Sequence, residues 1–370
     1  MSVKKSQHKL SAPIAIAIGV CLVLIFILYC LNFTNLFSKT YRAVADGLKF
    51  VEPPRVLDRV DYDRRMLILK TASSTIDFEV ASSTFTSTAT TGVTTTSTGI
   101  SNATIYPNVD AILPFYRIIA YYGNFLSTKM GVLGQYPEAE MLSRLRAEIK
   151  NWEEADPTTP VMPAIDYIAV TAQGSAGKDG KYRLQMPDVE IEKALELAKQ
   201  VNGIVILEIQ AGLSTLDVEI PELEKYLKLP QVHLALDPEF YMKKGNRPGS
   251  VIGTMDAEDI NYAINYLAKI VKENNLPPKV LVVHRFTSAM VTNSKKITPL
   301  PEVQVVMDMD GWGSPARKNT TYTKIVAPEF VQFTGFKLFY KNDILPPSTR
   351  LMSMEEVLKL KPRPIFIQYQ

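Results

Sequence analysis

The chain of 370 residues carries 41 Lys and Arg against 38 Asp and Glu, and this net charge of +3 predicts neither a nucleic acid nor another polyanion as partner. Only Cys21 and Cys30 occur, both in an apolar N-terminal run, so the rest of the chain can form neither a disulfide nor a thiolate metal site. The length suffices for two domains or for one (β/α)8 barrel of about 250 residues, which would be stabilised by a buried core.

An apolar run occupies residues 12–31, from Ala12 to Leu31, and three lysines precede it. About 20 such residues match the thickness of a bilayer core, which is about 30 Å. The lysines predict that residues 1–11 stay in the cytoplasm. The bulky Tyr29 beside Cys30 fits neither a cleavage site nor a lipobox. We therefore expect a single-pass signal anchor in the cell membrane, with the C-terminal part extracytoplasmic.

Residues 32–110 indicate an extracytoplasmic spacer. Its first part mixes charged and apolar residues, and residues 60–66 resemble a short helix or strand. From 72 to 104 Ser and Thr dominate, which leaves too little apolar surface to pack and predicts a stalk that could carry O-linked glycans. The alternative is an extended β-rich segment, since Thr and Val favour strands. Asn102 and Asn319 each begin an N-glycosylation sequon.

From Phe115 on, short apolar runs alternate with segments of helical period, the pattern of repeated βα units. The runs that predict buried parallel strands are 116–122, 161–169, 204–209, 232–236, 280–283, 303–307, 333–339 and 365–367. Eight strands, each followed by a helix or a long loop, predict a (β/α)8 barrel over residues 111–370.

Several helices have recognisable start signals. Residues 138–152 place five apolar side chains on one helical face. The expected N-terminal signals are Asp188 before 189–201, Asp256 before the longest helix, Ser314 before Pro315, and a capping box of Ser353 with Glu356.

A doubly wound open sheet is the alternative fold. It calls for a glycine-rich phosphate loop after the first strand. Gly123, Gly131 and Gly134 follow that strand without the G-x-G-x-x-G spacing, and no GxxxxGK[ST] motif occurs. The sequence therefore predicts the barrel and no nucleotide cofactor.

Polar and aromatic residues gather where the predicted strands end, which is where the site of such a barrel lies. In chain order they are Tyr122, Asn124, Asp166, Glu208, Gln210, Asp237, Glu239, His284, Arg285, Asp308, Asp310, Trp312, Lys337, Tyr340, Gln368 and Tyr369. Such a concentration predicts a binding cleft.

The chemistry these residues suggest is glycoside hydrolysis, which needs a protonated carboxyl and a second carboxylate. Asp237 and Glu239, two apart on an extended segment, would point to the same side, and their proximity would raise the pKa of one. We predict Glu239 as the acid and Asp237 as the group that tunes it. Candidates for the second carboxylate are Asp166, Glu208, Asp308 and Asp310, and candidates for stacking on sugars are Trp312, Tyr122 and Tyr340.

Two other functions fit the same residues. The barrel mouth could grip a glycan or a protein without catalysis, as a structural module of the cell surface. Alternatively, His284 with nearby carboxylates could complete the metal site of a hydrolase, although the sequence has no H-x-H or H-E-x-x-H pair and predicts no bound metal.

The D-x-E ending of the fourth strand resembles that of family 18 chitinases and family 25 lysozymes, which implies Glu239 as acid and Asp237 as helper. The chain departs from the chitinase pattern at Ala235, where an aspartate is usual, and from the lysozyme pattern on its first strand.

More of the chain resembles a group of bacterial secreted or lipid-anchored barrel proteins. The segments that carry this resemblance are YYGN with Gly131 and Gly134, LALDPEF, VIGTMDAEDIN and KVLVVHRFT, within residues 112–330. The resemblance implies an extracytoplasmic bacterial location and no particular activity.

Overall fold

A computed structural model describes residues 55–71 and 105–370, and the described residues from Val56 on form one compact unit. The predicted anchor, from Ala12 to Leu31, and the Ser/Thr-rich segment lie outside the described residues. Among the helices within 55–71 and 105–370, none combines the length and the apolar character that crossing a membrane requires.

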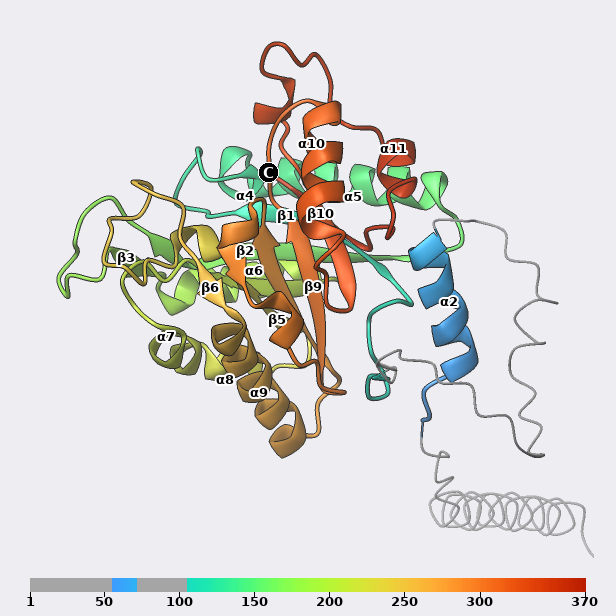
Figure 1. The fold of residues 1–370 in the computed structure, drawn as a ribbon, viewed down its shortest axis with the longest axis horizontal. Helices are drawn as coiled ribbons and strands as arrows, with labels where there is room; N and C mark the ends of the chain where they lie inside the picture. Colours follow the sequence, from blue (N-terminus) through green and yellow to red (C-terminus); the bar gives the residue numbers. More distant parts are fainter. Residues whose placement is uncertain (1–54, 72–104) are drawn as a thin grey trace, which may run out of the picture. The chain divides into compact units, whose positions relative to one another are not determined.

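Eight parallel strands close into a barrel (Figure 1). They are β1 (Arg117–Gly123), β2 (Val161–Ala172), β4 (Ile204–Ile209), β5 (Val232–Leu236), β7 (Lys279–Arg285), β9 (Val303–Met309), β10 (Phe333–Leu338) and β11 (Phe366–Tyr369). Each strand pairs with the next, and β11 pairs back onto β1. All eight predicted strands are confirmed, and the closure rules out the open sheet.

Helices surround the strands in Figure 1. They are α4 (Val132–Gln135), α5 (Glu138–Ala155), α6 (Asp188–Lys199), α7 (Leu216–Glu222), α8 (Glu224–Leu227), α9 (Ala257–Asn274), α10 (Pro315–Thr321) and α11 (Met354–Leu358). The connection from β7 to β9 contains two 3-10 turns, η2 (Ser288–Met290) and η3 (Ser294–Lys296), in place of an α-helix.

Most of the predicted helix starts are confirmed. Asp256 and Ser353 each form a capping box, and the Ser314 side chain accepts from the Arg317 amide. The prediction that Asp188 caps α6 is wrong, because the helix starts at Asp188 itself and its carboxylate pairs instead with Lys225. An acidic residue in the first turn still interacts favourably with the helix dipole.

Short accessory strands extend the barrel. β3 (Arg183–Gln185) pairs antiparallel with the end of β2. β6 (Met255–Asp256) and β8 (Val291–Thr292) pair with each other, which joins the loops that follow β5 and β7.

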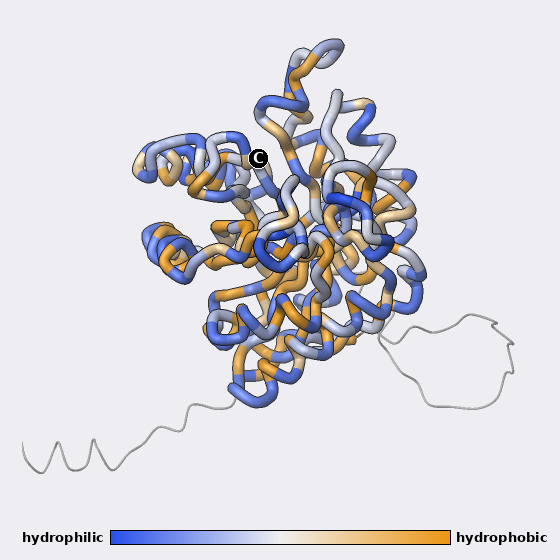
Figure 2. Tube along the Cα trace, turned by 90° about the vertical axis from the view of Figure 1, so that its left-hand side faces the viewer, coloured by the Kyte–Doolittle hydropathy of each residue, from blue (hydrophilic) through white to orange (hydrophobic). Residues whose placement is uncertain are grey.

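The core has two parts, and Figure 2 shows hydrophobic segments concentrated toward the inside of this unit. The larger part lies between the strands and the surrounding helices, around Leu145, Leu207 and Leu267. The smaller part fills the barrel interior with Ile118, Ala120 and other inward side chains. Successive residues of a strand alternate between these two sides.

Helix α2 (Arg59–Thr71) packs against the amino end of the barrel, although the sequence placed it in the spacer. Its Leu69 belongs to the cluster that fills the barrel interior, and the Leu69 carbonyl accepts from the Arg363 amide at 2.7 Å. The Tyr106 hydroxyl donates to Asp63 at 2.8 Å, so residues on both sides of 72–104 contact each other. The compact unit thus begins before residue 111, the predicted boundary.

This packing predicts that α2 contributes to the stability of the barrel. Leu69→Ala should lower the free energy of unfolding by about 2–4 kcal/mol, since it removes a side chain that is only 8% exposed. Leu67→Ala in the same helix, where the side chain is 40% exposed, should cost less than about 0.5 kcal/mol. Urea unfolding of both variants measures the difference. Equal losses of unfolding free energy would show that the packing of Leu69 in α2 does not stabilise the barrel.

Candidate active site

Each barrel strand places one polar residue facing inward at its carboxyl end or, for β5, directly after it. Together these residues form a buried layer, the polar ring. Its members are Tyr122, Asp166, Glu208, Asp237, His284, Asp308, Lys337 and Gln368, each no more than 4% exposed. Two residues earlier on these strands the inward side chains are small or apolar, as at Ala120, Ile206 and Val282. The alternation of strand side chains therefore places one charged layer on an apolar one.

His284 connects two carboxylates of the ring. Its Nε2 lies 2.9 Å from Glu208 Oε2 and its Nδ1 lies 3.0 Å from Asp308 Oδ2. Burial disfavours a charged imidazole, yet Glu208 and Asp308 raise the pKa of His284 well above its usual value. Likewise, burial opposes the ionisation of Glu208, but His284 lowers the pKa of that carboxyl. Glu208 and the His284 imidazolium thus form a buried ion pair, and the other ring nitrogen of His284 contacts Asp308, whose pKa is raised by burial and lowered in part by His284.

The two carboxyls from the strands on either side of Glu208, Asp166 and Asp237, favour protonation. Burial, and then the charge of Glu208, raise the pKa of Asp166 to about 8 and that of Asp237 well above its usual value. Gln368 donates to Asp166 at 2.6 Å. Some carboxyls of the polar ring are therefore protonated, whereas the negative charges of others are balanced by the positive charges of His284 and Lys337.

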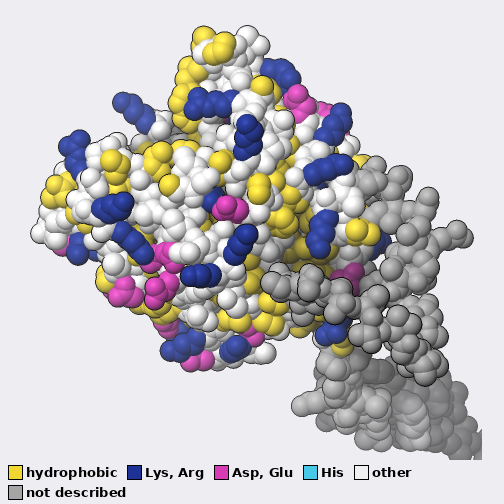
Figure 3. All heavy atoms as spheres, viewed as in Figure 1, with side chains coloured by type: hydrophobic (Ala, Val, Ile, Leu, Met, Phe, Trp, Pro, Cys, Tyr) yellow, Lys and Arg dark blue, Asp and Glu magenta, His cyan; other side chains and the backbone are white. Residues whose placement is uncertain are grey.

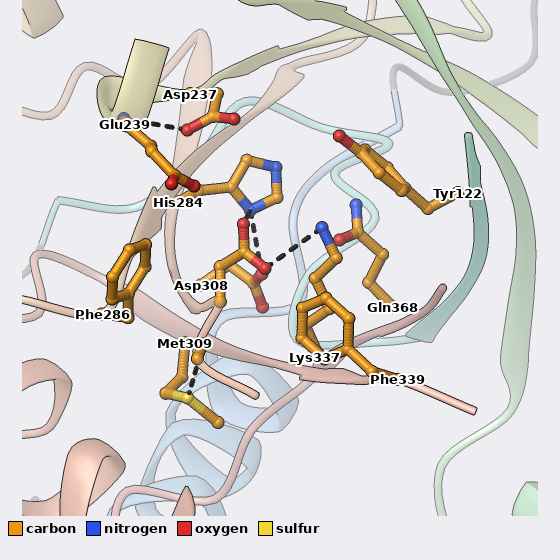
Figure 4. Close-up of polar contacts among 12 residues, drawn as sticks. Tyr122, Asp237, Glu239, His284, Phe286, Asp308, Met309, Lys337, Phe339 and Gln368 are labelled. Carbon is orange, nitrogen blue, oxygen red and sulfur yellow. Dashed lines mark hydrogen bonds and ion pairs between the residues drawn. The ribbon is translucent and has the colours of Figure 1, made fainter. Parts of the chain in front are cut away.

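Above the ring opens a cavity of about 570 Å³. The predicted site residues on its wall are Tyr122, Gln210, Asp237, Glu239, Asp310, Trp312 and Lys337. Figure 4 shows Asp237, Glu239 and Lys337 around a common space, with His284 between them and Tyr122 beside the Lys337 ammonium.

The remaining predicted residues do not line this cavity. Asp166, Glu208, His284, Asp308 and Gln368 lie in the ring beneath it and are fully buried. Arg285 follows the inward His284 and therefore points outward, where it pairs with Glu329 at 2.7 Å. Tyr340 also lies outside the barrel and donates to Glu148. Asn124 donates to the Ile168 carbonyl and shapes the loop after β1. We correct their placement accordingly.

Several wall residues were missed from the sequence, among them Lys129, Phe286, Arg317, Phe339 and Gln370. Phe286, Phe339 and Gln370 each stand two positions after a ring residue, so the alternation that links Asp308 to Asp310 could have found them. Lys129 and Arg317 come from a loop and a helix and carry no such signal.

Glu239 is the most distinctive group on the wall. The short 3-10 helix η1 (Pro238–Phe240) carries it, and the Asp237 side chain caps this helix by accepting from the Glu239 amide at 2.9 Å. Gln210 donates to the other oxygen of Asp237 at 3.3 Å. Burial, and then the nearby charge of Asp310, raise the pKa of Glu239 to about 7. Asp237 therefore orients Glu239, which is protonated at slightly acidic pH.

Asp310 forms an ion pair with the buried Lys337. Lys337 Nζ lies 3.1 Å from Asp310 Oδ1 and 3.7 Å from the centre of the Tyr122 ring. Burial opposes the charge of this lysine, but Asp310 and Glu208 raise its pKa, so it stays an ammonium. Lys337 balances the charge of Asp310 at the cavity wall.

The loop that carries Trp312 is fixed by a buried ion pair. Lys318 Nζ lies 2.9 Å from Asp343 Oδ2 and donates to the Gly311 carbonyl at 2.8 Å. Asp343 accepts from the Gly313 amide at 2.8 Å. The pair thus ties the loops after β9 and β10 together and sets the position of Trp312.

Asp343→Ala should therefore lower the free energy of unfolding by about 3–5 kcal/mol, because it leaves a buried ammonium unpaired. We also expect a change in the emission of Trp312, one of two tryptophans, whereas Trp152 is buried elsewhere. Combining Asp343→Asn with Lys318→Met removes both charges and should recover part of the loss. If the double variant is no more stable than Asp343→Ala, the ion pair does not fix this loop.

The closed sheet and its polar mouth define the protein as a (β/α)8 barrel. No protein-family model matches the chain, and no curated protein matches it either. Among solved structures it is similar to a hyperthermophilic endo-beta-1,4-glucanase in complex with substrate, with 8% identity and a TM-score of 0.34 over 69% of this chain and 89% of that one. A likeness at this level carries no argument about activity, so function has to be argued from the cavity.

Proposed function

We propose that the barrel is a glycoside hydrolase that acts on polysaccharide of the cell envelope. The observation that carries this proposal is Glu239, a carboxyl with a pKa of about 7 on the wall of a cavity that a second carboxyl, Asp310, also lines. A glycosidase needs such a pair, one member protonated and the other ionised.

In this mechanism protonated Glu239 donates its proton to the glycosidic oxygen as the bond to the anomeric carbon breaks. The electron pair of that bond leaves with the oxygen, which departs as an alcohol. Positive charge develops on the sugar ring and is stabilised by Asp310. Water then supplies a hydroxyl to the anomeric carbon, and its remaining proton restores Glu239.

Burial singles out Asp310 among the candidate second carboxylates. Asp166, Glu208 and Asp308 are fully buried and absent from the cavity wall, whereas Asp310 lines it. Asp310 and Glu239 line the same cavity, and after burial the charge of Asp310 raises the pKa of Glu239.

Aromatic side chains on the wall suit a sugar substrate. Trp312, Phe286 and Phe339 contribute to the lining, and Trp312 is 47% exposed. Aromatic rings present flat apolar faces on which sugar C–H groups can pack.

The alternative of a metal-dependent hydrolase is less well supported. Both ring nitrogens of His284 are taken by carboxylates, so neither has a free lone pair for a cation. Within 55–71 and 105–370, no three His, Cys, Asp or Glu side chains are grouped as metal ligands.

We also propose that the barrel is held outside the cytoplasm by the N-terminal apolar run. The support is the length of residues 12–31 and the lysines before them. Protease treatment of intact cells tests this orientation: digestion of the barrel is expected, and full protection would overturn it.

The activity itself is tested by incubating the protein with peptidoglycan and with chitin-type oligomers and measuring new reducing ends. Cleavage of one of them supports the enzyme. Binding without any cleavage would favour the alternative of a non-catalytic module that grips a glycan.

A further inference from the structure

Two cations on the cavity wall have no ion-pair partner among the residues that the structure describes. Lys129 lies in the loop between β1 and α4, and Arg317 lies in α10. The third cation of the wall, Lys337, is already engaged with Asp310. The cavity therefore offers two uncompensated positive charges, which the net charge of the whole chain conceals.

Arg317 is placed over the exposed aromatic platform. Its guanidinium carbon lies 5.3 Å from the centre of the Trp312 ring, and the indole is still 47% exposed. Gly313 makes this arrangement possible, because a Cβ at that position would lie only 2.7 Å from Arg317 Cδ. A flat apolar surface and a fork of hydrogen-bond donors thus lie side by side on the wall.

The acidic groups of the wall do not cancel these charges. Burial raises the pKa of Asp237 well above its usual value and that of Glu239 to about 7, so both are wholly or partly neutral at neutral pH. Lys337 balances Asp310. Figure 3 shows Lys, Arg, Asp and Glu side chains together on one face of the molecule.

We infer that the cavity takes an anionic polysaccharide whose sugars carry carboxylates, with a ring on Trp312 and carboxylates on Arg317 and Lys129. This inference rests on the proposed function and names its substrate class. Guanidinium groups bind carboxylates in a bidentate manner, and a neutral glycan would leave both cations without a counterion.

Binding to paired polymers tests the inference independently of catalysis. Protein carrying Glu239→Gln would be run in affinity electrophoresis with polygalacturonate against its methyl ester, and with peptide-free peptidoglycan strands against chitin oligomers. Each pair differs mainly in carboxylate charge. We expect at least tenfold tighter binding of one carboxylated member, weakening with salt. Equal binding of both pairs, or tighter binding of a poly(glycerol phosphate) polymer, would overturn the carboxylate assignment.

Matched variants locate the charge effect. Lys129→Gln with Arg317→Gln should weaken that binding about tenfold or more, whereas Lys199→Gln with Arg146→Gln, two exposed cations on outer helices, should leave it unchanged. Equal losses in the two double variants would show a general charge effect and overturn the site. Retained selectivity for carboxylated polymers without any cleavage by the unmutated protein would reject the hydrolase but keep the inference.

Discussion

Glu239→Gln should reduce hydrolysis by about 10²–10⁴-fold while substrate binding is retained. The glutamine side chain has nearly the same size as the carboxyl but has no acidic proton to donate. The substitution leaves the backbone unchanged, and so keeps the hydrogen bond from the backbone N–H of residue 239 to Asp237. Initial rates on the polysaccharide that the protein cleaves measure the effect. Glu196→Gln, an exposed carboxylate of α6, is the matched control and should have the activity of the unmutated protein.

An activated substrate separates acid catalysis from general damage. A glycoside with a dinitrophenol leaving group needs no protonation, so Glu239→Gln should cleave it nearly as well as the unmutated protein. Equal losses on activated and natural substrates would mean that Glu239 is not the acid.

The role of Glu239 as the acid also predicts how activity depends on pH. The acid must carry its proton, and the pKa of Glu239 lies near 7, so activity on natural substrates should fall as the pH rises through about 7. The same limb should be absent with the dinitrophenyl glycoside. A natural-substrate rate that keeps rising above pH 8 would contradict the assignment.

The barrel could be predicted from the sequence because its strands are buried on both faces and appear in the sequence as unbroken apolar runs. Val280, Val282 and Val283 are all buried, for example, although they alternate between the barrel interior and the helix layer. Helix α7 was missed, since it is short and contains Pro221. The absence of an α-helix between β7 and β9 could not be inferred from a connection of that length.

The site was predictable only to the level of a strand end. Asp308 and Asp310 face the same way, but one lies in the ring and the other on the wall, and this difference depends on the stagger of the strands around the barrel. The contact of His284 with Glu208 joins strands that are not neighbours in sequence or in the sheet. No spacing in the sequence encodes it.

The two buried histidines of the barrel should respond to the same substitution in different ways. His284→Leu leaves two buried carboxylates without their cation and should cost about 3–5 kcal/mol of stability. His233 is neutral instead: its Nδ1 accepts from the Val280 amide at 3.0 Å, and burial lowers its pKa well below the usual value. His233→Leu orphans one amide and should cost about 1–3 kcal/mol. Urea unfolding at neutral pH measures both losses.

The pH dependence of these losses distinguishes the charge states. The folded pKa of His284 is raised, so its stabilisation is complete below about pH 6.5, its usual value, and is lost as the pH rises through the folded pKa. The folded pKa of His233 is lowered, so the unmutated protein loses stability from this residue as the pH falls below about 6.5. The cost of His284→Leu should therefore shrink toward alkaline pH, and that of His233→Leu toward acidic pH. If the cost of His284→Leu instead shrinks between pH 6.5 and 5.5, His284 is not the imidazolium that holds the ring together.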